Sequence, residues 1–133
     1  MERVAFSGWV YISRAESVPG EWIAHCLDFD IVTQGSSPQQ ALAMAREAVE
    51  MCIADDLNSG LNPFERRADP EDWAPLYRLF EHHAAIPVDT MDRTTFNEFA
   101  VQMTFELVRL PAANKVTPAE PRQQPTVNPA VAA

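Results

Sequence analysis

The chain has 133 residues, 47% of them hydrophobic, and a formal net charge of −9. That length allows one domain built around one hydrophobic core. No apolar run approaches the roughly 18 residues of a membrane-spanning helix, and the first residues are charged instead of forming the apolar block of a signal peptide. We therefore expect a cytoplasmic protein that does not contact a membrane.

The acidity of the chain restricts its partners. Nucleic-acid binding depends on Lys and Arg that neutralise phosphates, and this chain has 10 such residues against 19 Asp and Glu. We expect no direct binding of nucleic acid. A basic protein partner would gain from electrostatic complementarity, although the same charge also gives a small domain its solubility.

The metal-ligating residue types are few and scattered. The two cysteines, Cys26 and Cys52, fall in apolar patterns typical of buried thiols. The histidines, His25, His82 and His83, do not combine with them in a zinc-binding spacing. We expect no metal site, no disulfide and no cofactor.

The first part of the chain predicts two strands joined by a turn. Residues 4–12 alternate with a period of two, and residues 22–27 form a second short run of strand type. Pro19 and Gly20 between them favour a turn. The sequence predicts a β-hairpin here.

An acidic corner, Asp28-Phe29-Asp30, leads into a short β-branched strand over residues 31–34. This third strand ends at Gly35. A helix is predicted next.

The helix begins with strong capping signals. Ser37 suits the N-cap, Pro38 the first helical position, and Gln40 the end of a capping box. An apolar stripe follows and predicts a helix that lies across the sheet, with Glu50 pointing away from it. The stripe comprises Ala41, Leu42, Ala45, Ala48, Val49, Cys52 and Ile53. The helix should end within residues 57–60, which include an Asn and a Gly.

Residues 61–88 form a helical insertion in the predicted domain. Trp73, Leu76, Tyr77 and Phe80 recur at helical spacing and predict a second, shorter helix. Its start is open between two capping residues, at positions 69 and 72. The later start is favoured because it keeps the proline at position 75 in the tolerated first turn.

The clearest strand is the last one, over residues 99–107, where large apolar residues alternate with smaller or polar ones. Its apolar face must be covered by helices of the same chain or by a second copy. From Pro111 the chain contains five prolines and few large apolar residues. We therefore divide the chain into a domain over residues 1–110 and a mobile or extended tail over residues 111–133.

Residues 24–35, followed by the capped helix that starts over residues 37–42, resemble the HicB-like antitoxin domain. The resemblance implies an α+β fold, in which a small antiparallel sheet (β-β-β-α-[α]-β) carries a helix on one face in a partial RNase H-like arrangement. Members of this family neutralise HicA-like toxins, which are small basic mRNA interferases. Complete antitoxins usually append a DNA-binding domain, and nothing after Leu110 is suited to form one. The resemblance therefore implies the protein-binding domain alone.

The proposed partner contacts centre on the acidic corner, where an aromatic side chain stands between two carboxylates. The residues expected to contact a partner are Trp22, His25, Asp28, Phe29, Asp30 and Gln34. A solvated turn with Phe29 tucked into the core is an equally good interpretation of the corner. We also expect the domain to form a homo-oligomer through a sheet edge or through its last strand.

Two other functions remain open. An acidic adaptor or accessory subunit would use the same fold in an assembly unrelated to toxins. A metal-dependent nuclease would use Asp28 and Asp30, which share a face in an extended run, but no third acid is evidently placed with them. Nothing resembles a nucleophile elbow or a phosphate-binding glycine loop, and the chain has only four glycines. We expect a non-enzymatic domain.

Overall fold

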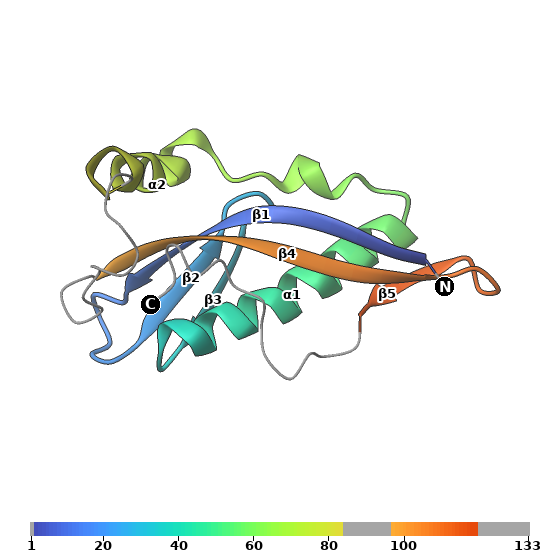
Figure 1. Ribbon diagram of the computed structural model, residues 1–133, viewed down its shortest axis with the longest axis horizontal. Helices are drawn as coiled ribbons and strands as arrows, with labels where there is room; N and C mark the ends of the chain where they lie inside the picture. The colour runs from blue at the N-terminus through green and yellow to red at the C-terminus, as the bar shows by residue number, and fades with distance from the viewer. Residues whose placement is uncertain (1, 84–96, 120–133) are drawn as a thin grey trace.

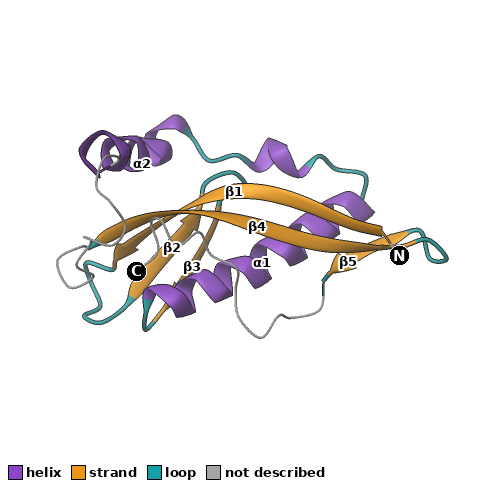
Figure 2. Ribbon diagram, in the orientation of Figure 1, coloured by secondary structure: helices purple, strands orange, loops and turns teal. Residues whose placement is uncertain are grey.

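The computed structural model describes residues 2–83 and 97–119. Five antiparallel strands form one curled sheet in the order β3-β2-β1-β4-β5 (Figure 1). Two α-helices pack on it, so the α+β fold class is confirmed (Figure 2). The elements are β1 (Glu2–Arg14), β2 (Trp22–Cys26), β3 (Ile31–Gly35), α1 (Pro38–Asn58), the 3-10 helix η1 (Pro63–Arg66), α2 (Pro70–His83), β4 (Glu98–Leu110) and β5 (Lys115–Pro118). No helix within the described residues has the length and apolar character needed to cross a membrane.

The larger part of the core lies between the sheet and α1. The helix crosses the sheet obliquely from β3 to β5 (Figure 1). Alternate side chains of β1, β2 and β4 point to it because successive residues of a strand face opposite sides. The buried residues here include Val10, Ile12, Trp22, Ala24, Cys26, Leu42, Val49, Ile53, Val101, Met103, Phe105 and Leu107. The apolar face of the last long strand is thus covered by α1 of the same chain and needs no second copy.

The opposite face carries a second, smaller core under α2. Its buried members are Leu27, Ala68, Trp73, Leu76, Leu79 and Ala100, and Trp9, Tyr11 and Phe80 pack against them. The sequence led us to expect a helix on one face only. The second helix covers part of the other face because its apolar stripe packs against Trp9 and Tyr11, which point to that face from β1.

The start of α1 confirms the predicted cap. The Ser37 hydroxyl accepts a hydrogen bond from the Gln40 amide at 3.0 Å, and Pro38 is the first helical residue. The Gln40 side chain differs from a standard capping box, since its Oε1 accepts from the amide of Ser36 at 2.5 Å instead of from that of Ser37. The hydrogen bond from the backbone to the Gln40 side chain therefore starts one residue earlier than in a standard capping box, in the turn after β3.

The start of α2 corrects the sequence prediction. The helix begins at Pro70, not after Asp72, and the Asp72 amide donates to the Asp69 carbonyl at 2.9 Å. Pro70 already has the φ value that the first helical position requires and loses no hydrogen bond there. The earlier start leaves Pro75 inside the helix, where it removes one backbone donor.

The predicted outward position of Glu50 is wrong. This residue of α1 is only 8% exposed, and its Oε2 accepts a hydrogen bond from the Glu106 amide of β4 at 2.5 Å. A carboxylate that accepts from a backbone amide can be buried without losing all its hydrogen bonds. Glu50 thus ties α1 to β4.

The chain that follows β4 also corrects the sequence analysis, which assigned everything from Pro111 to the tail. Residues 115–118 form β5, which pairs with β4, and Val116 is 8% exposed against the core. A turn containing Asn114, with a φ of 48°, reverses the chain between the two strands. The remainder of the predicted tail, residues 120–133, lies outside the described residues.

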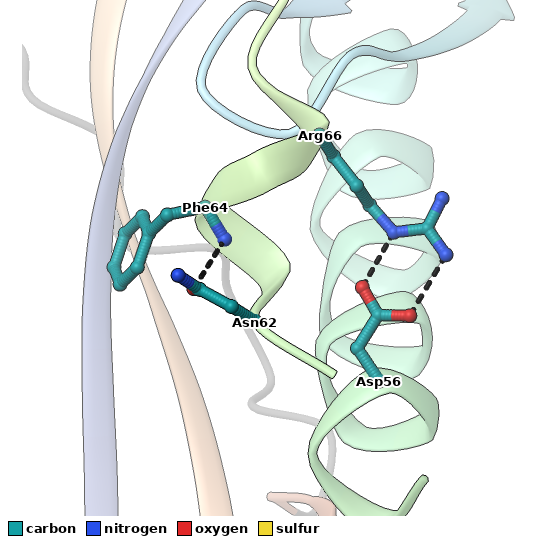
Figure 3. A network of polar contacts seen from close by, with 4 residues as sticks. All are labelled: Asp56, Asn62, Phe64 and Arg66. Atoms are coloured by element: carbon teal, nitrogen blue, oxygen red, sulfur yellow. Dashed lines mark hydrogen bonds and ion pairs between the residues drawn. The ribbon is translucent and has the colours of Figure 1, made fainter. Parts of the chain in front are cut away.

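A connector containing η1 runs from α1 to α2 and is anchored to α1. Asp56, whose side chain is 4% exposed, accepts two hydrogen bonds from Arg66, from Nε at 2.5 Å and from Nη2 at 2.8 Å (Figure 3). Asn62 accepts from the Phe64 amide at 3.0 Å and starts η1. The Phe64 ring packs against Phe6 with centroids 5.5 Å apart. This part of the predicted insertion is therefore an ordered element, and residues 84–88 lie outside the described residues.

Candidate functional site

The acidic corner lies in the connection between β2 and β3, residues 27–30, and its first carboxylate has a structural role. Asp28 Oδ1 accepts a hydrogen bond from the Trp9 amide of β1 at 2.6 Å. The neighbouring Leu27 amide donates to the Trp9 carbonyl at 2.9 Å. The Asp28 side chain thus extends the β1–β2 pairing past the end of β2, and it supplies an acceptor where the β2 backbone turns away.

Gly8 makes room for this contact. A Cβ atom at Gly8 would lie 3.3 Å from Asp28 Oδ1 and 3.1 Å from Cε2 of the buried Phe105. Both distances are tighter than ordinary van der Waals contact. The absence of a side chain at this strand position therefore allows the corner to lie against β1.

Phe29, the aromatic residue of the corner, belongs to the core. It is 1% exposed and meets Phe6 and Phe105 edge-on, with ring centroids 6.4 Å and 6.0 Å apart. Its ring also lies 5.6 Å from that of Phe64 in the connector. The position of Phe29 thus agrees with the second interpretation of the corner, a turn whose aromatic side chain is buried in the core.

Asp30, the last residue of the corner, has a left-handed backbone with a φ of 54°. Asp tolerates this region better than most residues. Its Oδ1 lies 2.7 Å from Nε2 of His25 on β2, and the side chains of His25 and Asp30 are 20% and 52% exposed. This polar pair is accessible to a partner.

The pair borders a surface that we call the β2–β3 strip, made of Ile23, His25, Val32 and Gln34. Ile23 faces Gln34 and His25 faces Val32 in the strand register, so all four share the sheet face opposite α1. Val32 is 59% exposed, Gln34 is exposed, and Ile23 and His25 are half-buried. The strip therefore presents two apolar side chains, Ile23 and Val32, and two polar ones, His25 and Gln34, on the face of β2 and β3 opposite α1.

Trp22 lies on the other face of β2. It is 7% exposed, its ring is 5.9 Å from that of Phe99, and the Arg14 guanidinium lies 4.3 Å above it. The structure therefore brings together His25, Asp30 and Gln34 from the expected contact residues. Trp22 joins the core.

Sequence reasoning missed Ile23 and Val32, although the signal was present. The alternation that places His25 and Gln34 outward also places these two apolar residues on the same face. The accessibility of this face at β2 and β3 depends on where α2 packs. The sequence did not predict that α2 lies over β1 and β4.

The geometry offers no assembled catalytic centre within the described residues. Asp28 and Asp30 turn to different partners, Trp9 and His25. No group of three or more His, Cys, Asp or Glu side chains in residues 2–83 and 97–119 is placed to hold a metal ion. Burial, the main cause, raises the pKa of the Cys26 thiol to about 12, so this thiol stays protonated near neutral pH.

Comparisons of the chain with protein-family models, with curated proteins and with solved structures found no match. The basis for a functional proposal is therefore the β2–β3 strip, the pair formed by His25 and Asp30, and the sequence resemblance to the HicB-like domain. The fold class itself is α+β, with five antiparallel strands and helices on both faces.

Proposed function

We propose that this chain is a non-enzymatic, protein-binding domain of HicB-like type that docks a basic protein on the β2–β3 strip. The observation that carries the proposal is the exposed Val32, at 59%, beside the accessible carboxylate of Asp30. An apolar contact bordered by a charge suits a protein interface, where buried apolar area supplies affinity and charge supplies orientation. The formal net charge of −9 steers a basic partner toward the domain.

The partner that the resemblance implies is a HicA-like toxin. Such a toxin holds RNA phosphates on a basic surface, and a domain with an excess of carboxylates complements that surface. The domain would inhibit the toxin by covering this surface, and it needs no catalytic group of its own. We propose that this binding takes place in the cytoplasm, where mRNA is cleaved.

A second candidate is an acidic adaptor that uses the same strip in another assembly. The observation that favours it is that α2, together with Ala68 of the connector, covers part of the face opposite α1. Tyr77 on α2 is 51% exposed and stacks on Trp73 with ring centroids 6.0 Å apart. An adaptor that joins two proteins would have two such surfaces, one on β2 and β3 and one on α2.

The test begins with the product of a neighbouring gene, if that gene encodes a small basic protein of the interferase type. We expect the purified domain to bind it in titration calorimetry and to inhibit its cleavage of RNA. Asp30→Asn should weaken binding about tenfold, which corresponds to about 1.4 kcal/mol. Asn tolerates the left-handed backbone at this position, so the variant removes charge and little else.

Glu47→Gln is the matched control, because it removes one negative charge from an exposed position of α1. Equal affinities of the two variants would contradict the assignment of the strip. Binding without inhibition, or a chromosomal neighbourhood with no small basic protein, would favour the adaptor.

A further inference from the structure

The two edges of the sheet are treated differently. On β5, Val116 exchanges two hydrogen bonds with the Asn58 side chain, both 2.8 Å long. Pro118 has no N–H to present at that edge. These bonds occupy the backbone groups that an added strand would need, so the β5 edge is closed.

The edge at β3 is open. The bond from Leu27 to the Trp9 carbonyl sets which residues of β1 pair with β2. Since Leu27 bonds to β1 and the direction of backbone groups alternates along a strand, Ala24 and Cys26 direct their backbone groups to β3. Their partner residues in β3, which include Thr33, therefore bond to β2. The amides and carbonyls of Val32 and Gln34 point away from β2. Within the described residues, β3 has β2 as its single strand partner.

The sequence of β3 lacks the usual protection of an edge. Natural edge strands carry charged residues, proline or a bulge that prevents pairing with another chain. This strand reads Ile-Val-Thr-Gln-Gly, with no charge and no proline, and it pairs with β2 without a bulge. Val32 adds a large exposed apolar side chain. An unprotected edge of this kind is expected where pairing is used.

We propose that β3 pairs in antiparallel fashion with β3 of a second copy of this chain, around a two-fold axis at Thr33. In this register Val32 of each copy lies opposite Gln34 of the other, and the outward groups form about four backbone hydrogen bonds. The strand is neutral, so no like charges meet at the junction although each copy carries −9. A neutral strand suits a second copy better than it suits the basic partner of the β2–β3 strip.

The helix layer supports the same arrangement. α1 starts beside β3 (Figure 1), so the two-fold axis brings the first turns of two α1 helices near each other. Met44 is 47% exposed and projects about 120° around the helix from Glu50, which reaches β4. Met44 therefore lies on the flank away from β4, where a second helix would bury it.

The dimer also enlarges the surface proposed for the basic partner. Pairing at β3 joins the β2–β3 strips of the two copies into one continuous surface. The proposal does not depend on the identity of that partner, because it is tested on the purified chain alone.

The experiment is sedimentation equilibrium of the full chain. We expect a dimer that tightens as salt rises, since salt screens the repulsion between two acidic copies. Val32→Lys places a charge at the edge. Gln34→Pro removes an N–H donor that has no partner among residues 2–83 and 97–119 of a single copy, and edge strands tolerate proline at such a position. Both variants should be monomers with unchanged circular dichroism. Leu61→Lys, at an exposed site after the end of α1 that lies by β5, should remain a dimer.

Amide exchange of the unmodified chain gives a second readout. The Val32 and Gln34 amides should be protected in the dimer, and the Val32 amide should exchange at least tenfold faster when Gln34→Pro is introduced. A chain that stays monomeric up to about 1 mM, the weak end of the affinity scale, would overturn the proposal. So would a dimer that survives both edge variants.

Discussion

Asn58, the last residue of α1, holds both backbone groups of Val116 in β5. Its Nδ2 donates to the Val116 carbonyl and its Oδ1 accepts from the Val116 amide, each at 2.8 Å. A side-chain amide carries a donor and an acceptor side by side, as a peptide group does, so it takes the place of one residue of a neighbouring strand. This contact attaches β5 to α1 and closes the edge of the sheet.

Asn58→Ala should lower the free energy of unfolding by about 1–2 kcal/mol, since two hydrogen bonds are lost at a partly buried site. Urea unfolding measures this change. Exchange of the Val116 amide should accelerate more than that of amides in β1. Lys115→Ala, at an exposed neighbouring position, is the control and should change stability by less than about 0.5 kcal/mol.

Two glycine substitutions should differ in cost. A Cβ at Gly35 would lie 2.7 Å from the Ala41 backbone nitrogen, whereas at Gly8 the nearest atom is the Phe105 ring at 3.1 Å. Backbone at the start of a capped helix moves less readily than a ring. Gly35→Ala should therefore destabilise more than Gly8→Ala, for which we expect about 1–3 kcal/mol from overpacking. Thermal unfolding of both variants tests the order, and a smaller loss for Gly35→Ala would contradict it.

Asp28 should tolerate an isosteric change and no truncation. Asp28→Asn keeps an Oδ1 acceptor for the Trp9 amide and should cost little, whereas Asp28→Ala leaves that amide without its acceptor and should cost about 1–3 kcal/mol. Chemical unfolding of both variants measures the difference. Equal losses would mean that the charge of Asp28, and not its acceptor, stabilises the corner.

The ion pair between Asp56 and Arg66 predicts a pH dependence. The two hydrogen bonds from Arg66 lower the pKa of Asp56 from its ordinary value. A carboxyl group whose pKa is lowered by folding stabilises the fold above its unfolded pKa of about 4, and this contribution is lost as the pH falls through the folded-state pKa. Arg66→Gln removes the contribution.

At neutral pH the unmodified chain should therefore be more stable than Arg66→Gln by about 1–2 kcal/mol. This is less than for a fully buried pair, because the Arg66 side chain is 46% exposed and screened by solvent. The difference should shrink below pH 4 or thereabouts in urea unfolding. A difference that stays constant between neutral and strongly acidic pH would show that Arg66 acts through packing alone.

Local patterns predicted most of the elements. The period-two runs predicted β1 and β4, the short strand-type and β-branched runs predicted β2 and β3, and the capping residues predicted the start of α1 at Pro38. These signals are visible in sequence because they depend on neighbours within a few residues. The start of α2 was misplaced because two capping residues, Asp69 and Asp72, compete there, and the prediction chose Asp72 to keep Pro75 out of the helix interior. The structure starts the helix at Pro70 and accommodates Pro75 inside it.

The candidate site was predicted only in part. The sequence pointed to the corner and to β2, but it could not separate the buried Phe29 and Trp22 from the accessible His25 and Asp30. Burial of a given side chain depends on what packs against it from distant parts of the chain. Phe29 is buried by Phe6 and Phe105, which are 23 and 76 positions away (29 − 6 and 105 − 29).

The sequence by itself determined the first four strands, the capped helix and the acidity of the domain, because periodicity, turn residues and charge act locally or add over the chain. Only the tertiary structure decided which edge of the sheet is closed and which face of β2 and β3 is left accessible. Lys115–Pro118 becomes a strand because Asn58 and the edge of β4 supply its hydrogen-bond partners. The pattern of residues 111–118 carries no record of those distant partners, and so it reads as a tail.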